Sequence, residues 1–185
     1  KNASLEGGTL SLAGIPAAQL AKEFGTPAFF LDEDAYRSRA LAWHNGLQSE
    51  FGEHAGTIYY AAKSFICTAV AQWIAEIGIG IDVCTGGELA AALAGGINPQ
   101  KIEVHGNNKS VAEIDRAVSV GVKTIVMDSL FEIERVAAAA KKHGVRQGVM
   151  LRLTPGIEAH THEKISTAHE DVKFGFSIAS GAAWA

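Results

Sequence analysis

The chain has 185 residues, of which 48% are hydrophobic and 19% charged, and its formal net charge is −4. This balance is typical of a globular domain with a sizeable core, and it offers no basic surface for nucleic acid or anionic lipid. No stretch reaches the roughly 18 uninterrupted apolar residues of a membrane span. Cys67 and Cys84 lie in apolar contexts typical of reduced core thiols. We therefore predict a soluble cytoplasmic protein without nucleic-acid or membrane partners.

The first predicted pair of elements is a strand followed by a helix. Pro27–Leu31 is a short apolar and aromatic run, which indicates a strand. A helical pattern follows from Asp32 or Glu33 to about Gln48. This pair is expected to begin a series of strand–helix units.

Evenly spaced strands follow. Their predicted starts lie near Ile58, Gly80, Ile102 and Thr124, each 22 residues after the last, and near Gly148, 24 residues later. Helices are predicted between the strands, each ending at a glycine, which is the residue that a helix C-cap favours. They are Ser64–Ile77, Gly87–Ala94, Ser110–Val120 and Ser129–His143.

The spacing favours consecutive βα units with a parallel sheet and right-handed crossovers. Leucine-rich repeats have a similar period, but their L-x-x-L-x-L signature is absent and these helices are too long. An open doubly wound sheet needs only five or six strands, but it usually has a glycine-rich turn after its first strand, and none follows Leu31. A closed barrel has eight strands. We therefore predict an α/β fold, the N-terminal part of a (β/α)8 TIM barrel with about six βα units.

Lys63 ends the apolar run Thr57–Lys63, at the carboxyl end of a buried strand. Desolvation there can lower the pKa of a lysine and make its amine a nucleophile toward an aldehyde. The alternative is a lysine whose side chain extends into solvent.

Other polar residues also follow predicted strands, at the edge where barrel enzymes collect their reactive groups. Each has a structural alternative. Asp128 and Ser129 suit a helix N-cap, Gly86 and Gly87 suit a tight turn, and His105 suits a structural imidazole. The full set is Asp32, Lys63, Asp82–Gly87, His105–Asn108, Asp128–Ser129 and Arg152.

The segment His160–Glu163 contains a His-x-His pair, which at a strand end suits zinc or iron. It falls well beyond the predicted strand, in a polar stretch without an evident second ligand set. We therefore predict a loop that faces solvent or substrate, and no metal site.

Several motifs are distinctive in combination: Phe24–Pro27, Tyr60–Lys63, Asp82–Leu89, His105–Ser110 and His160–Gly175. Through them the whole chain resembles the diaminopimelate decarboxylases, and the last stretch is similar to their actinobacterial branch. The Tyr-Ala-x-Lys and Asp-x-x-Ser/Thr-x-Gly-Glu motifs are shared with ornithine and arginine decarboxylases. The His-Gly-Asn-Asn-Lys run favours the diaminopimelate enzymes.

The resemblance implies an alanine-racemase-type barrel that binds pyridoxal 5′-phosphate and is followed by a β domain. Lys63 matches the lysine that holds the cofactor covalently. Asp82 and Arg152 match positions that line the cofactor pocket, although the two can also form a purely structural ion pair. His105 is a further cofactor-binding candidate.

The family reaction removes a carboxylate from meso-2,6-diaminopimelate to give L-lysine and CO2, the last step of lysine biosynthesis, in a homodimer. The resemblance leaves open an ornithine- or arginine-type decarboxylase and a non-catalytic pyridoxal-phosphate-binding barrel.

The resemblance also suggests a domain division. Residues 1–12, with a strand at Ser4–Leu12, are assigned to the β domain, and residues 13–185 to the N-terminal part of the barrel. Gly175–Ala182 is predicted to begin a helix. The groups for the phosphate and the pyridine nitrogen are expected beyond Ala185. Expressed alone, these residues should bind the cofactor poorly, lack activity and self-associate through unpaired strand edges.

Overall fold

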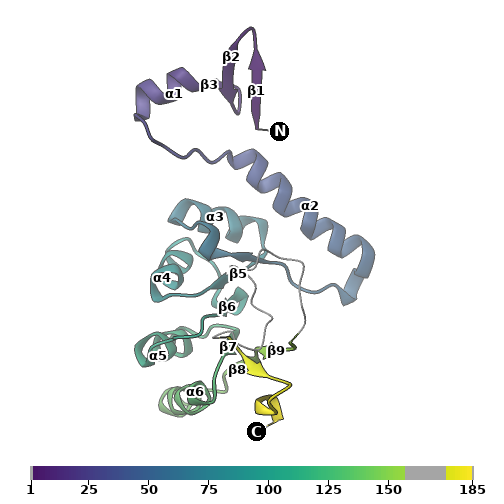
Figure 1. Ribbon diagram of the computed structural model, residues 1–185, viewed down its shortest axis with the longest axis vertical. Coiled ribbons are helices and arrows are strands. Elements are labelled where there is room, and N and C mark those ends of the chain that lie inside the picture. Colours follow the sequence, from purple (N-terminus) through teal and green to yellow (C-terminus); the bar gives the residue numbers. More distant parts are fainter. Residues whose placement is uncertain (1, 157–173, 185) are drawn as a thin grey trace. The chain divides into compact units, whose positions relative to one another are not determined.

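The computed structural model describes residues 2–156 and 174–184. These residues form two compact units that divide between Gly56 and Thr57 (Figure 1). Each unit has its own secondary structure, and the five-stranded parallel sheet belongs to the second.

The first unit begins with a three-stranded antiparallel sheet, in the order β1-β2-β3. The predicted single strand over Ser4–Leu12 is wrong, because Gly7 and Gly8 both have positive φ and turn the chain back on itself. The elements of this unit are β1 (Ala3–Glu6), β2 (Thr9–Leu12), β3 (Ile15–Pro16), α1 (Ala17–Phe24), α2 (Glu33–Phe51) and η1 (Gly52–His54).

The strand predicted over Pro27–Leu31 is also wrong, since these residues adopt no regular structure. A strand depends on hydrogen bonds from a neighbour, and the described residues supply none here; Phe29 is fully exposed. The helix that follows is confirmed and extends to Phe51. It begins where the Asp32 carboxylate accepts the Ala35 N–H at 3.0 Å.

The second unit contains the predicted βα series. Its five strands are parallel and lie in chain order, which excludes a doubly wound sheet. Four strand starts are as predicted, and the first lies one residue later. The strands are β4 (Tyr59–Ala61), β5 (Gly80–Val83), β6 (Ile102–Val104), β7 (Thr124–Met127) and β8 (Gly148–Leu151).

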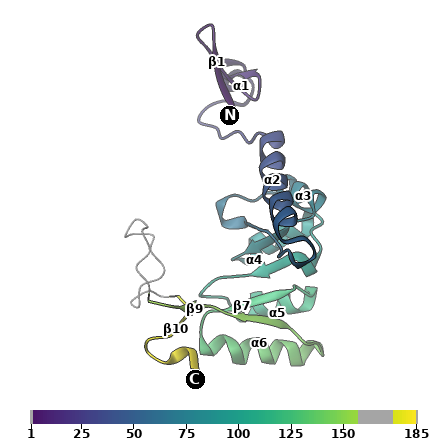
Figure 2. The same ribbon diagram turned by 90° about the vertical axis from the view of Figure 1, so that its right-hand side faces the viewer.

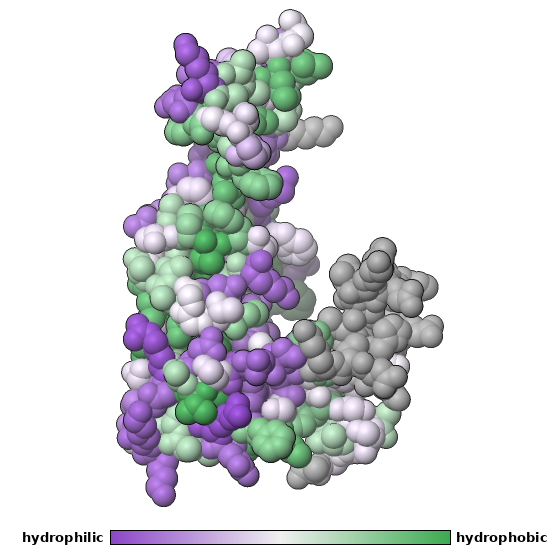
Figure 3. All heavy atoms as spheres, turned by 60° about the vertical axis from the view of Figure 1, so that its left-hand side comes forward, coloured by the Kyte–Doolittle hydropathy of each residue, from purple (hydrophilic) through white to green (hydrophobic). Residues whose placement is uncertain are grey.

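Four helices stack in order along one side of this sheet (Figure 1). The first begins four residues later than predicted, because Ser64 belongs to a short 3-10 turn, η2 (Ala62–Ser64), that precedes it. The other three begin within one residue of the predicted position. Hydrophilic side chains gather at the lower left of Figure 3, with apolar patches between them, as amphipathic helices require. The helices are α3 (Thr68–Ile77), α4 (Gly86–Ala94), α5 (Val111–Val120) and α6 (Leu130–His143), with a 3-10 turn, η3 (Pro99–Lys101), before β6.

The two faces of the sheet differ in chemistry, because successive side chains of a strand alternate between them. One face is apolar and buried, and it includes Ile81, Val83, Ile102, Val104 and Ile125. On the other face the strand register places five residues side by side, which we call the cross-sheet row. It consists of Ala61, Asp82, Glu103, Thr124 and Gly148.

A sixth parallel strand is present, but it is not the predicted one. β9 (Leu153–Thr154) continues β8 past Arg152 and pairs with β10 (Phe176–Ser177), as Figure 2 shows. The helix predicted to begin at Gly175 is therefore wrong. The buried Phe176 instead donates its backbone N–H to Arg152 O at 2.8 Å, and only a 3-10 turn, η5 (Ala182–Trp184), follows.

Within the described residues, no helix has both the length and the apolar character needed to cross a membrane.

Candidate active site

The cross-sheet row reaches the carboxyl edge of the sheet at Ala61, the last residue of β4. Lys63 lies in η2, two residues beyond Ala61. His105 follows β6, where its backbone N–H donates to Val83 O at 2.7 Å and continues the ladder. Arg152 does the same after β8, donating to Met127 O at 3.0 Å. Lys63, His105 and Arg152 therefore follow alternate strands of the parallel sheet, β4, β6 and β8, at one edge.

The pKa of the Cys84 thiol depends on burial and on the charged groups near it, which include Lys63. Burial raises the pKa of the Cys84 thiol, and the carboxylates of Asp82 and Glu88 raise it further. The ammonium groups of Lys63 and Lys109 act in the opposite direction. The thiol is therefore protonated at neutral pH and a poor nucleophile. The prediction of core thiols holds in part: both cysteines are free, but Cys67 is exposed.

His105 stands beside a carboxylate from its own strand. Its Nε2 lies 3.8 Å from Glu103 Oε2, with the two residues two positions apart and on the same face of the sheet. The His105 side chain is one-third exposed. Glu103 is therefore the carboxylate placed to pair with this imidazole at the edge of the sheet.

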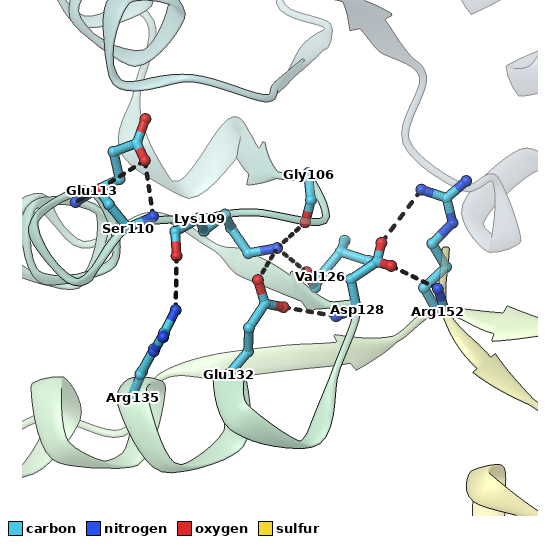
Figure 4. Close-up of polar contacts among 10 residues, drawn as sticks. Gly106, Lys109, Ser110, Glu113, Val126, Asp128, Glu132, Arg135 and Arg152 are labelled. Atoms are coloured by element: carbon cyan, nitrogen blue, oxygen red, sulfur yellow. Dashed lines mark hydrogen bonds and ion pairs between the residues drawn. The ribbon is translucent and has the colours of Figure 1, made fainter. Parts of the chain in front are cut away.

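Arg152 pairs with Asp128 rather than with Asp82, so the alternative of a structural Asp82–Arg152 ion pair is wrong. Arg152 Nη1 lies 3.3 Å from Asp128 Oδ2 (Figure 4), and the guanidinium stacks 4.2 Å from the centre of the Phe174 ring. The other oxygen of Asp128 accepts the Gly175 N–H at 2.5 Å. The N-cap alternative for this carboxylate is therefore wrong: its contacts hold β8 and the segment before β10.

A further sequence pattern, not among the predictions above, explains how the turns between strands and helices are stabilised. Three successive helices begin with Ser/Thr-x-x-Glu, the pattern of a capping box, in which side chain and backbone satisfy each other's free groups. The three pairs are Thr85 with Glu88, Ser110 with Glu113, and Ser129 with Glu132.

The first two pairs form complete capping boxes. Glu113 also reaches across to the neighbouring turn, where its Oε1 accepts the Gly86 N–H at 2.9 Å. Backbone hydrogen bonds from Ser110 and Gly86, followed by the Ser110 hydroxyl, lower the pKa of Glu113. This carboxylate therefore joins the starts of α4 and α5.

In the third pair the glutamate serves a different group. Glu132 Oε2 accepts the Asp128 N–H at 2.7 Å, and Oε1 lies 3.1 Å from Lys109 Nζ (Figure 4). The Ser129 side chain makes no capping bond. The Lys109 ammonium, almost completely buried, also donates to Gly106 O and, at 2.7 Å, to Val126 O. Two of its donors thus have carbonyl acceptors, and its charge is balanced by the ion pair with Glu132, whose Oε1 is buried and accepts no hydrogen bond from the described residues.

This arrangement decides what the edge can bind. A helix N-terminus is a ready anion site only while its N–H groups are free. At α4, α5 and α6, glutamate carboxylates already accept N–H groups of the turns that begin these helices. The edge instead offers a lysine amine, a carboxylate, an imidazole and a guanidinium. That donor set fits an aromatic aldehyde such as the pyridoxal ring.

The His160–Glu163 segment lies outside the described residues. Within the described ranges, no group of three or more His, Cys, Asp or Glu side chains is placed to hold a metal ion.

Comparison with known proteins identifies the class. Residues 35–184 match the family model described as pyridoxal-dependent decarboxylase, pyridoxal binding domain. The chain therefore belongs to this family of pyridoxal-phosphate enzymes. The predicted α/β class, the N-terminal part of an alanine-racemase-type barrel, is confirmed, as is the cofactor.

Within this family, the chain is closely similar to diaminopimelate decarboxylases. The chain is 56% identical to the diaminopimelate decarboxylase of Mycobacterium tuberculosis and 52% identical to that of Mycobacterium leprae, in each case over 97% of its own length. It covers 39% and 37% of those relatives, so it spans about two-fifths of their length.

The solved structure of diaminopimelate decarboxylase from M. jannaschii in complex with L-lysine is 29% identical, with a TM-score of 0.85. The match covers all of this chain and 43% of that one. The predicted resemblance to diaminopimelate decarboxylases is thereby confirmed.

The buried Lys109–Glu132 pair gives a stability prediction. Replacing Lys109 with Met leaves the Glu132 carboxylate buried without its counter-charge, which should lower the free energy of unfolding by about 3–5 kcal/mol. The double variant Lys109→Met/Glu132→Gln should recover part of this loss, because no buried charge remains unpaired. Urea denaturation measures both. The exposed Lys123 provides the control, whose Met variant should change stability by less than about 1 kcal/mol. Near-wild-type stability of Lys109→Met would contradict the assignment.

Glu113 gives a pH prediction. Its pKa is lower in the folded than in the unfolded chain, so its stabilising effect is complete above the unfolded value of about 4.3 and is lost as pH falls through the folded value. The stability difference between wild type and Glu113→Gln should therefore be steady near neutral pH and shrink in acid. Urea titrations between about pH 3 and pH 7 test this. A difference that stays constant throughout would show that the charge of Glu113 plays no part.

Proposed function

We propose that the protein carrying this chain decarboxylates meso-2,6-diaminopimelate to L-lysine and CO2, with Lys63 as the residue that holds pyridoxal phosphate. The observation that supports this most is the position of Lys63. It is the lysine of the Tyr-Ala-x-Lys motif, at the carboxyl edge of the barrel sheet, in a chain 56% identical to diaminopimelate decarboxylases.

The bound cofactor supplies an electron sink for the bond to the departing carboxylate. The chain's own residues would prepare for this chemistry. The amine of Lys63 must be neutral to attack an aldehyde carbon, so its proton has to leave first. Asp82, in the cross-sheet row beside Ala61, is a nearby carboxylate that can stabilise the ammonium form of Lys63 between turnovers.

Arg152 and His105 would act at the other side of the site. Asp128 and Phe174 fix the orientation of the Arg152 guanidinium. We infer that Arg152 lines the cofactor pocket as the counter-charge to anionic groups there. His105, with Glu103 behind it, is the further candidate for contact with the cofactor.

Several finer points belong to the same proposal. The substrate is a small amino acid, the complete enzyme works as a homodimer in the cytoplasm, and residues 1–12 belong with a β domain. The groups for the phosphate and the pyridine nitrogen lie in other parts of the protein. An ornithine- or arginine-type decarboxylase shares the Lys63 and Asp82 motifs, and rates with the three substrates distinguish these readings. A non-catalytic carrier would bind the cofactor and turn over none of them.

The assignment of Lys63 predicts a specific covalent label. The complete protein with pyridoxal phosphate should be yellow, and borohydride should fix the cofactor on the peptide that contains Lys63. Lys63→Ala should lose both the label and nearly all turnover. Peptide mapping by mass spectrometry gives the answer, and a label on Lys101, Lys109 or Lys173 would refute the proposal.

A tuning role for Asp82 predicts a separation of rate from stability. Asp82→Ala should slow decarboxylation by about 100-fold, which corresponds to ~2.7 kcal/mol of barrier, and change the melting temperature little. Asp115→Ala removes a carboxylate that pairs with Lys142 and His143 on the helical side, and it serves as the matched control. Early melting of Asp82→Ala with normal turnover per folded molecule would make Asp82 a structural residue.

A further inference from the structure

Lys63 sits on a short piece of chain between two regular elements. β4 ends at Ala61, η2 covers Ala62–Ser64, and α3 does not begin until Thr68. The side chain of Lys63 is exposed and long, so the place from which its amine starts depends on how firmly this turn is held. Tyr60 and Ser64, which flank the turn, make the relevant contacts.

The Tyr60 hydroxyl bonds to the chain just after the turn. It donates a hydrogen bond to Phe65 O at 2.6 Å, which ties the last part of β4 to the residue after η2. This bond closes a loop of six residues with Lys63 inside it. Phe65 itself is extended, so the bond fixes the point at which the chain leaves the turn.

Ser64 completes the arrangement. Its hydroxyl oxygen lies 2.9 Å from the Tyr60 hydroxyl and 2.8 Å from Ala61 O. Since a serine has one proton to donate, it bonds to either acceptor, and both choices tie Ser64 back to β4. The two residues therefore close the turn on both sides of Lys63.

The strand register places the Tyr60 side chain behind the site. Tyr60 pairs with Ile81, which belongs to the buried apolar face, whereas Ala61 pairs with Asp82 in the cross-sheet row. Successive residues of a strand point to opposite faces, so Tyr60 lies on the face away from Asp82. It is placed to act on the reaction through the backbone of the Lys63 turn.

We propose that Tyr60 and Ser64 are positioning residues for Lys63, and that their hydroxyls hold η2 so that the Lys63 amine meets the aldehyde of the cofactor. This rests on the proposed function of Lys63. The physical reason is that a fixed origin raises the effective concentration of the amine at the aldehyde carbon, while a loose turn spreads it over many positions.

The chain offers a closely matched control. Tyr59 is the neighbouring tyrosine of the same strand, but its hydroxyl lies 3.1 Å from Lys123 Nζ, and its backbone pairs with Gly80 at the start of β5. Tyr59→Phe and Tyr60→Phe each remove one hydroxyl from one strand. Only Tyr60→Phe removes a contact to the Lys63 turn.

The experiment follows covalent attachment rather than turnover. The complete protein is freed of cofactor and mixed with pyridoxal phosphate, and attachment is followed by the visible absorbance band and by borohydride trapping on the Lys63 peptide. Tyr60→Phe should slow the rate constant for attachment about tenfold, with an unchanged melting temperature. Tyr59→Phe should change it less than about twofold. Ser64→Ala should slow it as well, and together with Tyr60→Phe it should cost less than the two separate effects combined, because the residues share a contact.

The outcomes separate the two proposals. If unsubstituted protein carries no label on Lys63, the proposed function fails and this inference fails with it. If Lys63 is labelled and Tyr60→Phe attaches cofactor as fast as Tyr59→Phe, only the positioning role is overturned. Should Tyr60→Phe fold poorly, an attachment rate for Ser64→Ala equal to wild type overturns it instead.

Discussion

The parallel register of the second unit is the constraint on which the site depends. It places Asp82 between Ala61 and Glu103 in one row, and it brings the residues after each strand to one edge. Two glycines permit this register. A Cβ on Gly80 would meet the Tyr59 ring at 2.6 Å, and one on Gly148 would meet Lys123 O at 2.5 Å. A slip of one residue would exchange the polar and apolar faces of a strand, so the register and the chemistry are set together.

The second structural theme is the use of glutamates at the starts of helices. Backbone N–H groups at a helix start need acceptors, and here Glu88, Glu113 and Glu132 supply them. The third also neutralises the buried Lys109, which sits between the turn after β6 and the end of β7. These glutamates thereby stiffen the turns. The side chains at the carboxyl edge that remain for a ligand include those of Lys63, His105 and Arg152.

Much of this fold could be predicted because the regular part of the chain is locally consistent. Strand starts at Gly80, Ile102 and Thr124 and the helices between them follow from apolar runs that end at glycines. The errors occurred where a segment depends on distant neighbours. Pro27–Leu31 has the composition of a strand but no pairing partner among the described residues, while Phe176 becomes a strand because Leu153 lies beside it.

The candidate site divides in the same way. That Lys63, His105 and Arg152 follow strands of one sheet at the same edge could be predicted from spacing, since parallel strands finish at one edge. The partner of Arg152 could not be predicted. Asp128 lies 24 residues away in sequence, and only the folded structure shows that Arg152 pairs with it rather than with Asp82. The capping boxes were readable in the sequence as Ser/Thr-x-x-Glu, whereas the diversion of Glu132 to Lys109 depends on packing around a buried ammonium.

We propose that the cofactor binds on the polar face of the sheet, at its carboxyl edge. A crystal structure of the complete protein after borohydride reduction in the presence of pyridoxal phosphate tests it most directly. We expect electron density that runs from Lys63 Nζ into a pyridine ring on the same face as Asp82. A ring attached to another lysine, or one inserted on the apolar face beside Ile81, would contradict it.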